Sequence, residues 1–431
     1  MTTPLPSDAT IPSVDVAALQ RRTVGSLVGV QATGALGITI GIATSSLLAR
    51  DLSGSEEVAG LAQTFQVLGA AVAAFLLARV MTRRGRRAGL VAGYLTASAG
   101  ALVAVVSGVA GSTLLLLAGM VLLGFATAAN SAARYAATDL APVHHRARAL
   151  SLVVWATTIG AVLGPNLTGP SVDLAALLGV PDLTGPFVLG AAGTTAAALL
   201  AFLLLRPDPL VTARAVASGG HEGGPRPAVV AGRGAAGGDV RAAFRQHPVL
   251  VAATAGLTGA HATMVAVMVM TPLHMEHGGA ELRLIGVVIS VHVLGMFAFS
   301  PVAGWVADRW GRGRTLGVGG AVLLVSLALS GSSPEGSSWQ IFAGLFLLGL
   351  GWSVATISAS TLLAEHAPLE VRAGVQGTAD MTMMLGAAAA SALAGVVVGT
   401  FGYPVLNAYA AVLALGVVTA AAFVARHAGR A

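Results

Sequence analysis

Met264, Met268, His292 and Met296 are the residues of this chain whose types and spacing could do chemistry. They form an MxxxM and an HxxxM pair, and each pair shares one helix face because positions i and i+4 lie one turn apart. Two antiparallel helices carrying these pairs would direct three thioether sulfurs and one imidazole nitrogen into a common space. Such ligands favour a soft metal ion, Cu(I) above all. The four residues therefore predict a copper site.

Ordinary core packing is the alternative for each pair. Methionine fills irregular gaps between apolar helices, so a single MxxxM in a hydrophobic segment is a weak indication of a ligand set. A single buried histidine is more often held by hydrogen bonds than by a metal. An imidazole inside a membrane span is costly, however, and functional by default. Because both pairs fall on adjacent predicted spans, we expect them to act together as ligands.

The composition assigns the chain to the membrane. Of 431 residues, 55% are hydrophobic and only 10% are charged, whereas a soluble domain carries about 25% charged residues. Twelve stretches approach the ~20 residues that cross a bilayer. We therefore predict an all-α membrane protein with 12 transmembrane helices. The expected spans are 25–49, 58–80, 89–109, 113–138, 149–170, 186–205, 248–273, 284–306, 315–332, 338–362, 374–399 and 404–425.

The distribution of charge sets the orientation. The net charge is +6, there is no lysine, and 21 of the 24 arginines fall in the termini and the even-numbered loops of this topology. Basic residues stay on the cytoplasmic side, so we expect both termini in the cytoplasm and the protein in a bacterial-type plasma (inner) membrane. The charge thus indicates topology and not nucleic-acid binding. With no cysteine, soft-metal chemistry depends on methionine and histidine, and we see no cleavable signal peptide.

An internal repeat divides the chain into two parallel six-helix halves, an arrangement typical of transporters. Three separate matches share an offset of 226 residues. They are Arg83–Arg87 with Arg309–Arg312, Ala141–Pro142 with Ala367–Pro368, and Gln66–Gly69 with His292–Gly295. The predicted organisation is a cytoplasmic tail (1–24), an N-terminal lobe (25–206), a Gly/Pro-rich linker (207–246) acting as a flexible tether, and a C-terminal lobe (247–426) carrying the metal site.

The repeat also serves as an internal control on the metal hypothesis. At the same offset, His292 and Met296 correspond to Gln66 and Ala70, which are not soft ligands. The metal-binding side chains are thus an addition to a shared scaffold. If the seventh span ends near Pro272, Met264 and His292 both lie about 12 Å below the outer boundary at 1.5 Å per residue.

The loop after the eighth span carries the segment Gly304-Trp305-Val306-Ala307-Asp308-Arg309-Trp310-Gly311-Arg312. It resembles the GxxxDRxGR loop motif of the major facilitator superfamily, and the resemblance to that superfamily covers the whole chain. It implies two six-helix lobes and a latch that stabilises one conformation of the transport cycle, formed here by Gly304, Asp308, Arg309, Gly311 and Arg312. Alternatively, the arginines only fix topology. The N-terminal copy departs from the motif, with Thr82 at the aspartate position and Ala78 at the first glycine.

The paired motifs Met264-xxx-Met268 and His292-xxx-Met296 are also similar to those of the CcoA-like copper importers, a subgroup of the same superfamily. This resemblance implies copper import into the cytoplasm for cytochrome oxidase assembly, and a cytoplasmic copper acceptor as partner. We expect a monomer in the lipid bilayer with copper as the transported substrate, no cofactor and no nucleic-acid partner.

Other polar residues are secondary candidates. His261 precedes Met264 by one turn and suits a supporting contact or a proton acceptor. His274, Met275 and His277 end the predicted seventh span, where they either collect metal at the outer mouth or lie in a solvated loop. Asp380 in the eleventh span either couples protons or pairs with an arginine, and Arg134 is expected to pair with Asp139. We expect Met381, Met383 and Met384 to face lipid or to serve packing.

A rival function rests on Gly160–Pro165, which resembles a fifth-span motif of the superfamily's antiporters. It favours a proton-coupled exporter of small organic compounds with an aromatic, acidic cavity, yet only 5% of the chain is aromatic. A membrane sensor would normally add a soluble domain. An enzyme is disfavoured because the chain has no phosphate-binding loop and no nucleophile elbow.

Overall fold

The computed structural model describes residues 15–218 and 235–428. These residues are helical apart from short turns, and twelve helical segments are long and apolar enough to cross a membrane. The predicted all-α architecture with twelve transmembrane helices is confirmed.

The N-terminal half contains α1 (Val16–Ser53), α2 (Glu56–Arg84), α3 (Arg86–Ala110), α4 (Thr113–Ala136), α5 (Arg146–Asn166), α6 (Thr168–Leu178) and α7 (Gly185–Leu204). The C-terminal half contains α10 (Pro248–His277), α11 (Leu282–Phe297), α12 (Ser300–Trp310), α13 (Arg312–Gly331), α14 (Trp339–His366), α15 (Arg372–Phe401) and α16 (Tyr403–Ala428). Single 3-10 turns, Val143–His145 and Asp182–Thr184, precede α5 and α7.

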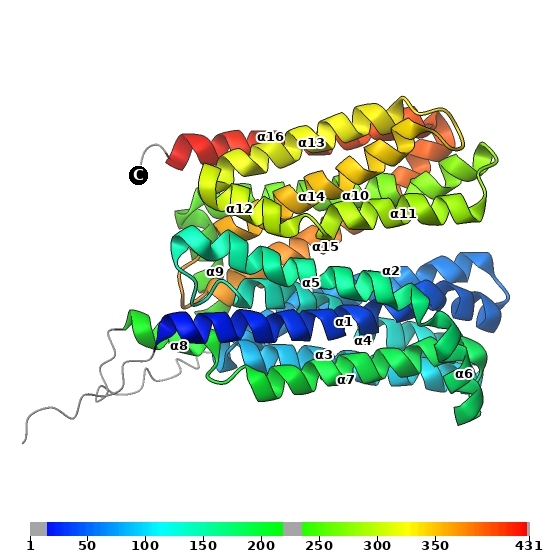
Figure 1. The fold of residues 1–431 in the computed structure, drawn as a ribbon, viewed down its shortest axis with the longest axis horizontal. Helices are drawn as coiled ribbons and strands as arrows, with labels where there is room; N and C mark the ends of the chain where they lie inside the picture. The colour runs from blue at the N-terminus through cyan, green and yellow to red at the C-terminus, as the bar shows by residue number, and fades with distance from the viewer. Residues whose placement is uncertain (1–14, 219–234, 429–431) are drawn as a thin grey trace, which may run out of the picture.

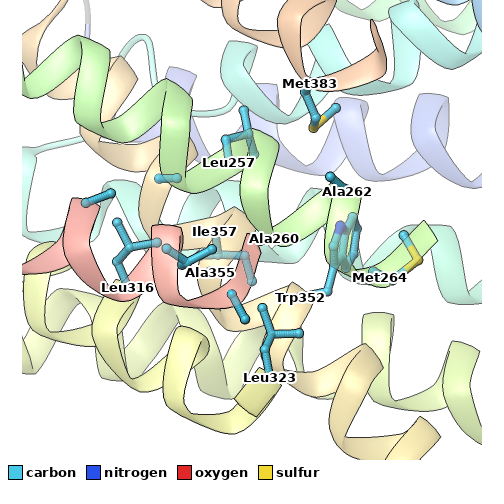
Figure 2. Packing of buried hydrophobic residues seen from close by; sticks show 14 of the residues in the cluster. Leu257, Ala260, Ala262, Met264, Leu316, Leu323, Trp352, Ala355, Ile357 and Met383 are labelled. Atoms are coloured by element: carbon cyan, nitrogen blue, oxygen red, sulfur yellow. The ribbon is translucent and has the colours of Figure 1, made fainter. Parts of the chain in front are cut away.

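The two halves lie side by side with their helices along one axis (Figure 1). The start of α1 and the finish of α16 lie at the same end of the bundle, on the left of that view. We call this end the terminal face, and the arginine distribution predicts that it is cytoplasmic. Each half has its own buried apolar cluster, and Figure 2 shows part of the cluster in the C-terminal half.

The linker between the halves is partly helical, although the sequence suggests a tether. Helices α8 (Pro209–Ala217) and α9 (Ala235–Gln246) occupy its two ends. Asp208 caps α8, because its Oδ1 accepts bonds from the N–H groups of Leu210 and Val211 at 3.0 and 3.1 Å. Residues 219–234 of the predicted linker and 1–14 of the predicted tail lie outside the described residues.

The 226-residue repeat extends to individual hydrogen bonds. The fourth span of each half begins at a serine cap: Ser112 Oγ accepts from Leu115 N, and Ser338 Oγ accepts from Ile341 N. The loop arginines repeat as well: Arg86 Nε donates to Asp139 at 2.7 Å, and Arg312 Nε donates to Glu365 at 3.0 Å. Each donor and acceptor in the second half lies 226 positions after its counterpart in the first, so equivalent residues occupy equivalent places.

Two spans of the C-terminal half differ from their predicted limits. The seventh span does not stop near Pro272: α10 passes through it and continues to His277. The eighth span is not one helix, because α11 ends at Phe297 and α12 begins at Ser300. Pro301, at the start of α12, has no N–H to continue the ladder of hydrogen bonds. Next to it, Ser300 Oγ donates to the carbonyl of Met296 at 3.2 Å.

Candidate functional site

Helix α14 positions two histidines from two different helices. His292 on α11 is 1% exposed, and its Nδ1 lies 2.9 Å from the carbonyl oxygen of Leu345. His261 on α10 accepts a hydrogen bond at its Nδ1 from Nε1 of Trp352, also at 2.9 Å. Leu345 and Trp352 are both on α14, two turns apart. The same helix therefore sets the height of both imidazoles.

The hydrogen bond of His292 determines its tautomer. A carbonyl oxygen only accepts, so Nδ1 is the ring nitrogen that carries the proton. In a neutral imidazole Nε2 then keeps its lone pair. This Nε2 is buried and has no hydrogen-bond partner among the described residues. Metal-ligating histidines are oriented in the same way, with the second ring nitrogen donating to a carbonyl or carboxylate.

The two contacts with α14 also fix the register between α10 and α11. Helix α10 runs antiparallel to α14, so the two turns from Trp352 back to Leu345 match the two turns from His261 to Met268. Met268 therefore lies at the height of His292. The i+4 spacing then places Met264 at the height of Met296, one turn closer to the terminal face.

This register corrects the depth expected from the sequence, which paired Met264 with His292. The prediction was wrong because α10 continues beyond Pro272 to His277. Met268 lies nine residues before the end of α10 and His292 ten residues after the start of α11. Both are thus about 14 Å from the outer ends of their helices.

All four candidate ligands lie in or against the core of the C-terminal half. Met264 is 6% exposed, and Met268 and Met296 are partly buried against the same cluster. On α10, His261, Met264 and Met268 follow a spacing of three and four residues and share one face of the helix. Within the described residues, no group of three His, Asp or Glu side chains can hold a metal ion. A metal at this place would need the methionine sulfurs.

Helices α11 and α14 are held close by glycine. A side chain at Gly349 on α14 would collide with the carbonyl of His292 and lie 2.8 Å from the amide nitrogen of Met296. Gly124 on α4 packs against Gln66 and Ala70 in the same way. Gln66 and Ala70 are thus the structural counterparts of His292 and Met296, as the repeat predicts. This close approach brings the Leu345 carbonyl within reach of the His292 ring.

The residues expected at the outer mouth belong mostly to the interior. His274 and Met275 are buried within α10, so a solvated loop is wrong for them, whereas His277 is exposed at the helix end. His274 stacks on Tyr403 with ring centroids 4.0 Å apart and lies 3.2 Å from Ser333 Oγ. It is thirteen residues after His261, which places it about 140° around α10 from His261. His274 and Met275 do not lie in a loop because α10 continues past Pro272 to His277.

Comparison with known sequences decides the family. The sequence matches the Major Facilitator Superfamily over residues 26–287 and 255–430. The chain belongs to the major facilitator superfamily. It is accordingly a multi-pass secondary transporter, a membrane carrier and not an enzyme.

Full-length relatives of this facilitator agree with that assignment. It is 35% identical to the "uncharacterized MFS-type transporters" YddS and YdeG of Bacillus subtilis, over 92% of the chain and 89% and 90% of the relatives. It is 28% identical to the riboflavin transporter RfnT of Brucella anthropi, over 90% of the chain and 92% of that protein. The fold matches the proton:xylose symporter XylE with a TM-score of 0.71 at 15% identity, covering 95% and 96% of the two chains. It matches the fucose:proton symporter FucP of E. coli with a TM-score of 0.65 at 14% identity, covering 93% and 98%.

The loop motif of the facilitator contacts the opposite half at the terminal face. Both oxygens of Asp308 accept backbone N–H bonds at the start of α5, from Ala147 at 3.2 Å and Arg148 at 3.1 Å. A carboxylate at a helix N-terminus is favourable because of the helix dipole. Arg312 reaches Asp308 at 3.0 Å and also donates to the carbonyl of Val143 in the opposite half.

Three glycine and arginine positions complete the description of this motif. Gly304 packs directly against Ser151 of α5, and Gly311 has φ +92°, a conformation that favours glycine. Arg309 lies elsewhere: it is exposed, with its guanidinium 5.8 Å from the centroid of the Trp305 ring. The contact with the opposite half is therefore made by Gly304, Asp308 and Arg312, and not by Arg309.

The buried acid of the eleventh span has an arginine partner. Asp380 Oδ1 lies 2.6 Å from Arg134 Nη2 and accepts from Tyr135 Oη at 3.2 Å. The expected pairing of Arg134 with Asp139 is wrong, because Asp139 is held by Arg86. Sequence proximity suggested the nearest acid, whereas the packing of α4 against α15 brings a distant one.

Two buried side chains were not among the site candidates chosen from the sequence. Trp352 carries no motif, and only its contact with His261 reveals it. Gln66 is 2% exposed, and its Oε1 has no hydrogen-bond partner among the described residues. The repeat had already aligned Gln66 with His292, which was a usable signal.

Proposed function

We propose that this facilitator imports copper into the cytoplasm through a site formed by Met264, Met268, His292 and Met296. The observation that supports the proposal most strongly is the free Nε2 of His292. Leaving a polar atom buried without a partner costs about 1–3 kcal/mol, so this atom, about 14 Å from the outer end of α11, is a candidate to bind a ligand. A metal ion would accept this lone pair.

The neighbouring side chains favour a soft, singly charged ion. Three thioethers and one neutral imidazole carry no charge, so they suit Cu(I) better than a hard divalent ion that prefers carboxylate and water. In this register the proposed ligands lie at two heights, Met268 with His292 and Met264 with Met296. An ion passing from the first pair to the second moves about 6 Å toward the terminal face, one helical turn.

The contacts between the halves are consistent with alternating access. The described hydrogen bonds that join the two halves, such as those of Asp308 and Asp380, lie in the half of the bundle next to the terminal face. Opening that face would require these bonds to break. We propose that copper then leaves into the cytoplasm of a bacterial-type cell, from a monomeric carrier in the plasma membrane, and passes to an acceptor for cytochrome oxidase assembly.

A second candidate substrate is a flat organic molecule. It is favoured by the 28% identity, over 90% of the chain, to a protein named as a riboflavin transporter. In this case Trp352 and Phe297, whose rings meet edge to face at 5.7 Å, would stack on the substrate. Export of small organic compounds driven by protons belongs to the same class.

Copper uptake by cells that lack their own copper importer tests whether copper or an organic molecule is the substrate. Cells expressing the wild-type chain should accumulate copper, and His292→Ala should abolish this gain while leaving expression unchanged. The same cells are assayed for riboflavin uptake and for efflux of organic dyes. Copper accumulation equal to that of empty cells, together with riboflavin uptake that His292→Ala does not alter, would overturn the copper proposal.

A further inference from the structure

Trp352 is the one tryptophan of this chain that is buried. All five tryptophans lie in the described residues, and Trp352 is 7% exposed whereas each of the others is at least 38% exposed. It is located in the middle of α14, two turns closer to the terminal face than Leu345, the partner of His292. A large aromatic side chain therefore lies closer to the terminal face than the Leu345–His292 contact.

Its contacts reach both helices of that site. The Nε1–H group donates to His261, three residues before Met264 on α10. The ring meets Phe297, the residue after Met296 on α11, edge to face at 5.7 Å. Trp352 and Met264 belong to the same buried cluster, and Figure 2 labels both. Trp352 thus contacts both helices that carry the four candidate ligands, α10 through His261 and α11 through Phe297.

The hydrogen bond with His261 has a chemical consequence. The indole N–H only donates, so Nδ1 of His261 must accept, and the proton of the neutral ring is on Nε2. The lone pair of Nδ1 is therefore used by Trp352. As long as this bond lasts, His261 cannot offer Nδ1 to a metal ion.

We propose that Trp352 closes the metal site on the side of the terminal face and so forms its floor. We also propose that its hydrogen bond keeps Nδ1 of His261 from binding the ion until the ion moves toward that face. The inference rests on the proposed copper function and extends it. An ion bound by Met268 and His292, the pair farther from the terminal face, faces the electron-rich indole. This arrangement favours a cation. When the ion moves toward the terminal face, the Trp352–His261 bond breaks, and Nδ1 of His261 donates its lone pair to the ion. No proton is transferred in this exchange, because Nε2 keeps its hydrogen.

Silver titration of the purified protein tests the floor. Ag(I) is a soft, singly charged probe that does not change oxidation state in buffer, and tryptophan fluorescence reports an ion next to the indole. Wild type should bind Ag(I) with quenching, and Trp352→Phe should bind Ag(I) without it. Trp155→Phe, the same change on α5, should keep the quench. Unaltered quenching in Trp352→Phe would overturn the assignment of Trp352 as the floor.

The affinity for Ag(I) tests the proposed role of His261 as the next ligand. Trp352→Phe frees Nδ1 of His261, so Ag(I) should bind about tenfold more tightly, on the scale by which outer-shell partners tune metal affinity. Adding His261→Ala to this variant should return the affinity to that of wild type. His261→Ala alone should bind Ag(I) normally, with the quench retained, but transport copper slowly. Wild-type affinity in Trp352→Phe together with normal transport in His261→Ala would overturn the inference.

The two proposals fail in different ways. If the wild-type chain binds no Ag(I), or if His292→Ala binds as tightly as wild type, the copper proposal itself is wrong. If His292→Ala abolishes binding and the Trp352 and His261 variants behave as wild type, only the further inference is wrong. Melting temperatures of all variants, with and without Ag(I), show whether each one is folded.

Discussion

Arg134 on α4 and Asp380 on α15 form an ion pair between the two halves of the protein, with 2.6 Å between Nη2 and Oδ1. Both side chains are nearly inaccessible, 7% and 5% exposed. Tyr135 adds a second hydrogen bond to the same carboxylate oxygen. Because each partner comes from a different half, the pair joins the halves in this conformation and must separate if the terminal face opens.

The first prediction concerns this pair. Asp380→Ala leaves the Arg134 charge buried and unpaired, so it should destabilise the protein by about 3–5 kcal/mol. The double variant Arg134→Gln/Asp380→Asn removes both charges and should recover most of that loss. Thermal unfolding in detergent measures the difference. Equal losses in the single and double variants would contradict an energetic coupling between the two residues.

Transport by the same double variant separates the two roles left open for Asp380. If Asp380 couples protons, the double variant in proteoliposomes should let copper equilibrate across the membrane but should not concentrate it under a pH gradient. If the residue only pairs with Arg134, accumulation should resemble that of wild type. The measurement is copper content of proteoliposomes with and without the gradient.

The second prediction concerns Asp308. Asp308→Ala removes the acceptor for the first N–H groups of α5, a loss worth about 0.5–2 kcal/mol, and should favour opening of the terminal face. The chain has no cysteine, so Ala78→Cys, which packs against Gly377 of the other half, reports the opening through its rate of alkylation. Labelling should be faster with Asp308→Ala. Arg309→Ala is the control and should leave the rate unchanged, because Arg309 lies on Trp305.

The third prediction tests the glycine contact behind the metal site. Gly349→Val should push α11 away from α14, because a side chain there collides with the His292 carbonyl. The Leu345–His292 hydrogen bond would be lost and Ag(I) affinity should fall at least as far as in His292→Ala. Gly395→Val is the matched control: a side chain there meets no atom within 4 Å. Similar affinities for the two valine variants would argue against this positioning role.

The fourth prediction distinguishes ligand from filler among the methionines. Met264→Ala should abolish copper uptake, as should His292→Ala. Met383→Ala removes an equally buried thioether, 1% exposed, and should lower stability by about 2–5 kcal/mol with little effect on uptake per folded molecule. Uptake normalised to folded protein and the melting temperature are both required. The same loss of uptake in all three variants would indicate a folding defect instead of a binding site.

The sequence alone was sufficient for the architecture and for the choice of candidate ligands. Hydrophobic length and arginine placement depend only on the chain and the bilayer, so twelve spans and a preferred orientation could be predicted. The 226-residue repeat could be read in the same way, and it correctly aligned Gln66 with His292. The i+4 spacing of Met264 with Met268 and of His292 with Met296 is likewise a property of the helix itself.

Only the tertiary structure determined which residues of α10 and α11 lie at the same level, and which residues form hydrogen bonds or ion pairs with each other. Helix α10 continues past Pro272, where Thr271 and His274 contact Tyr403 and Ser333. The contacts of His261 and His292 with α14 place Met268, and not Met264, level with His292. The tautomer of His292 depends on Leu345, which is 53 residues away, and the partner of Asp380 is 246 residues away. Spacing along the chain specifies one helix at a time, whereas a hydrogen bond between helices depends on how their surfaces pack, and that packing is a property of the whole fold.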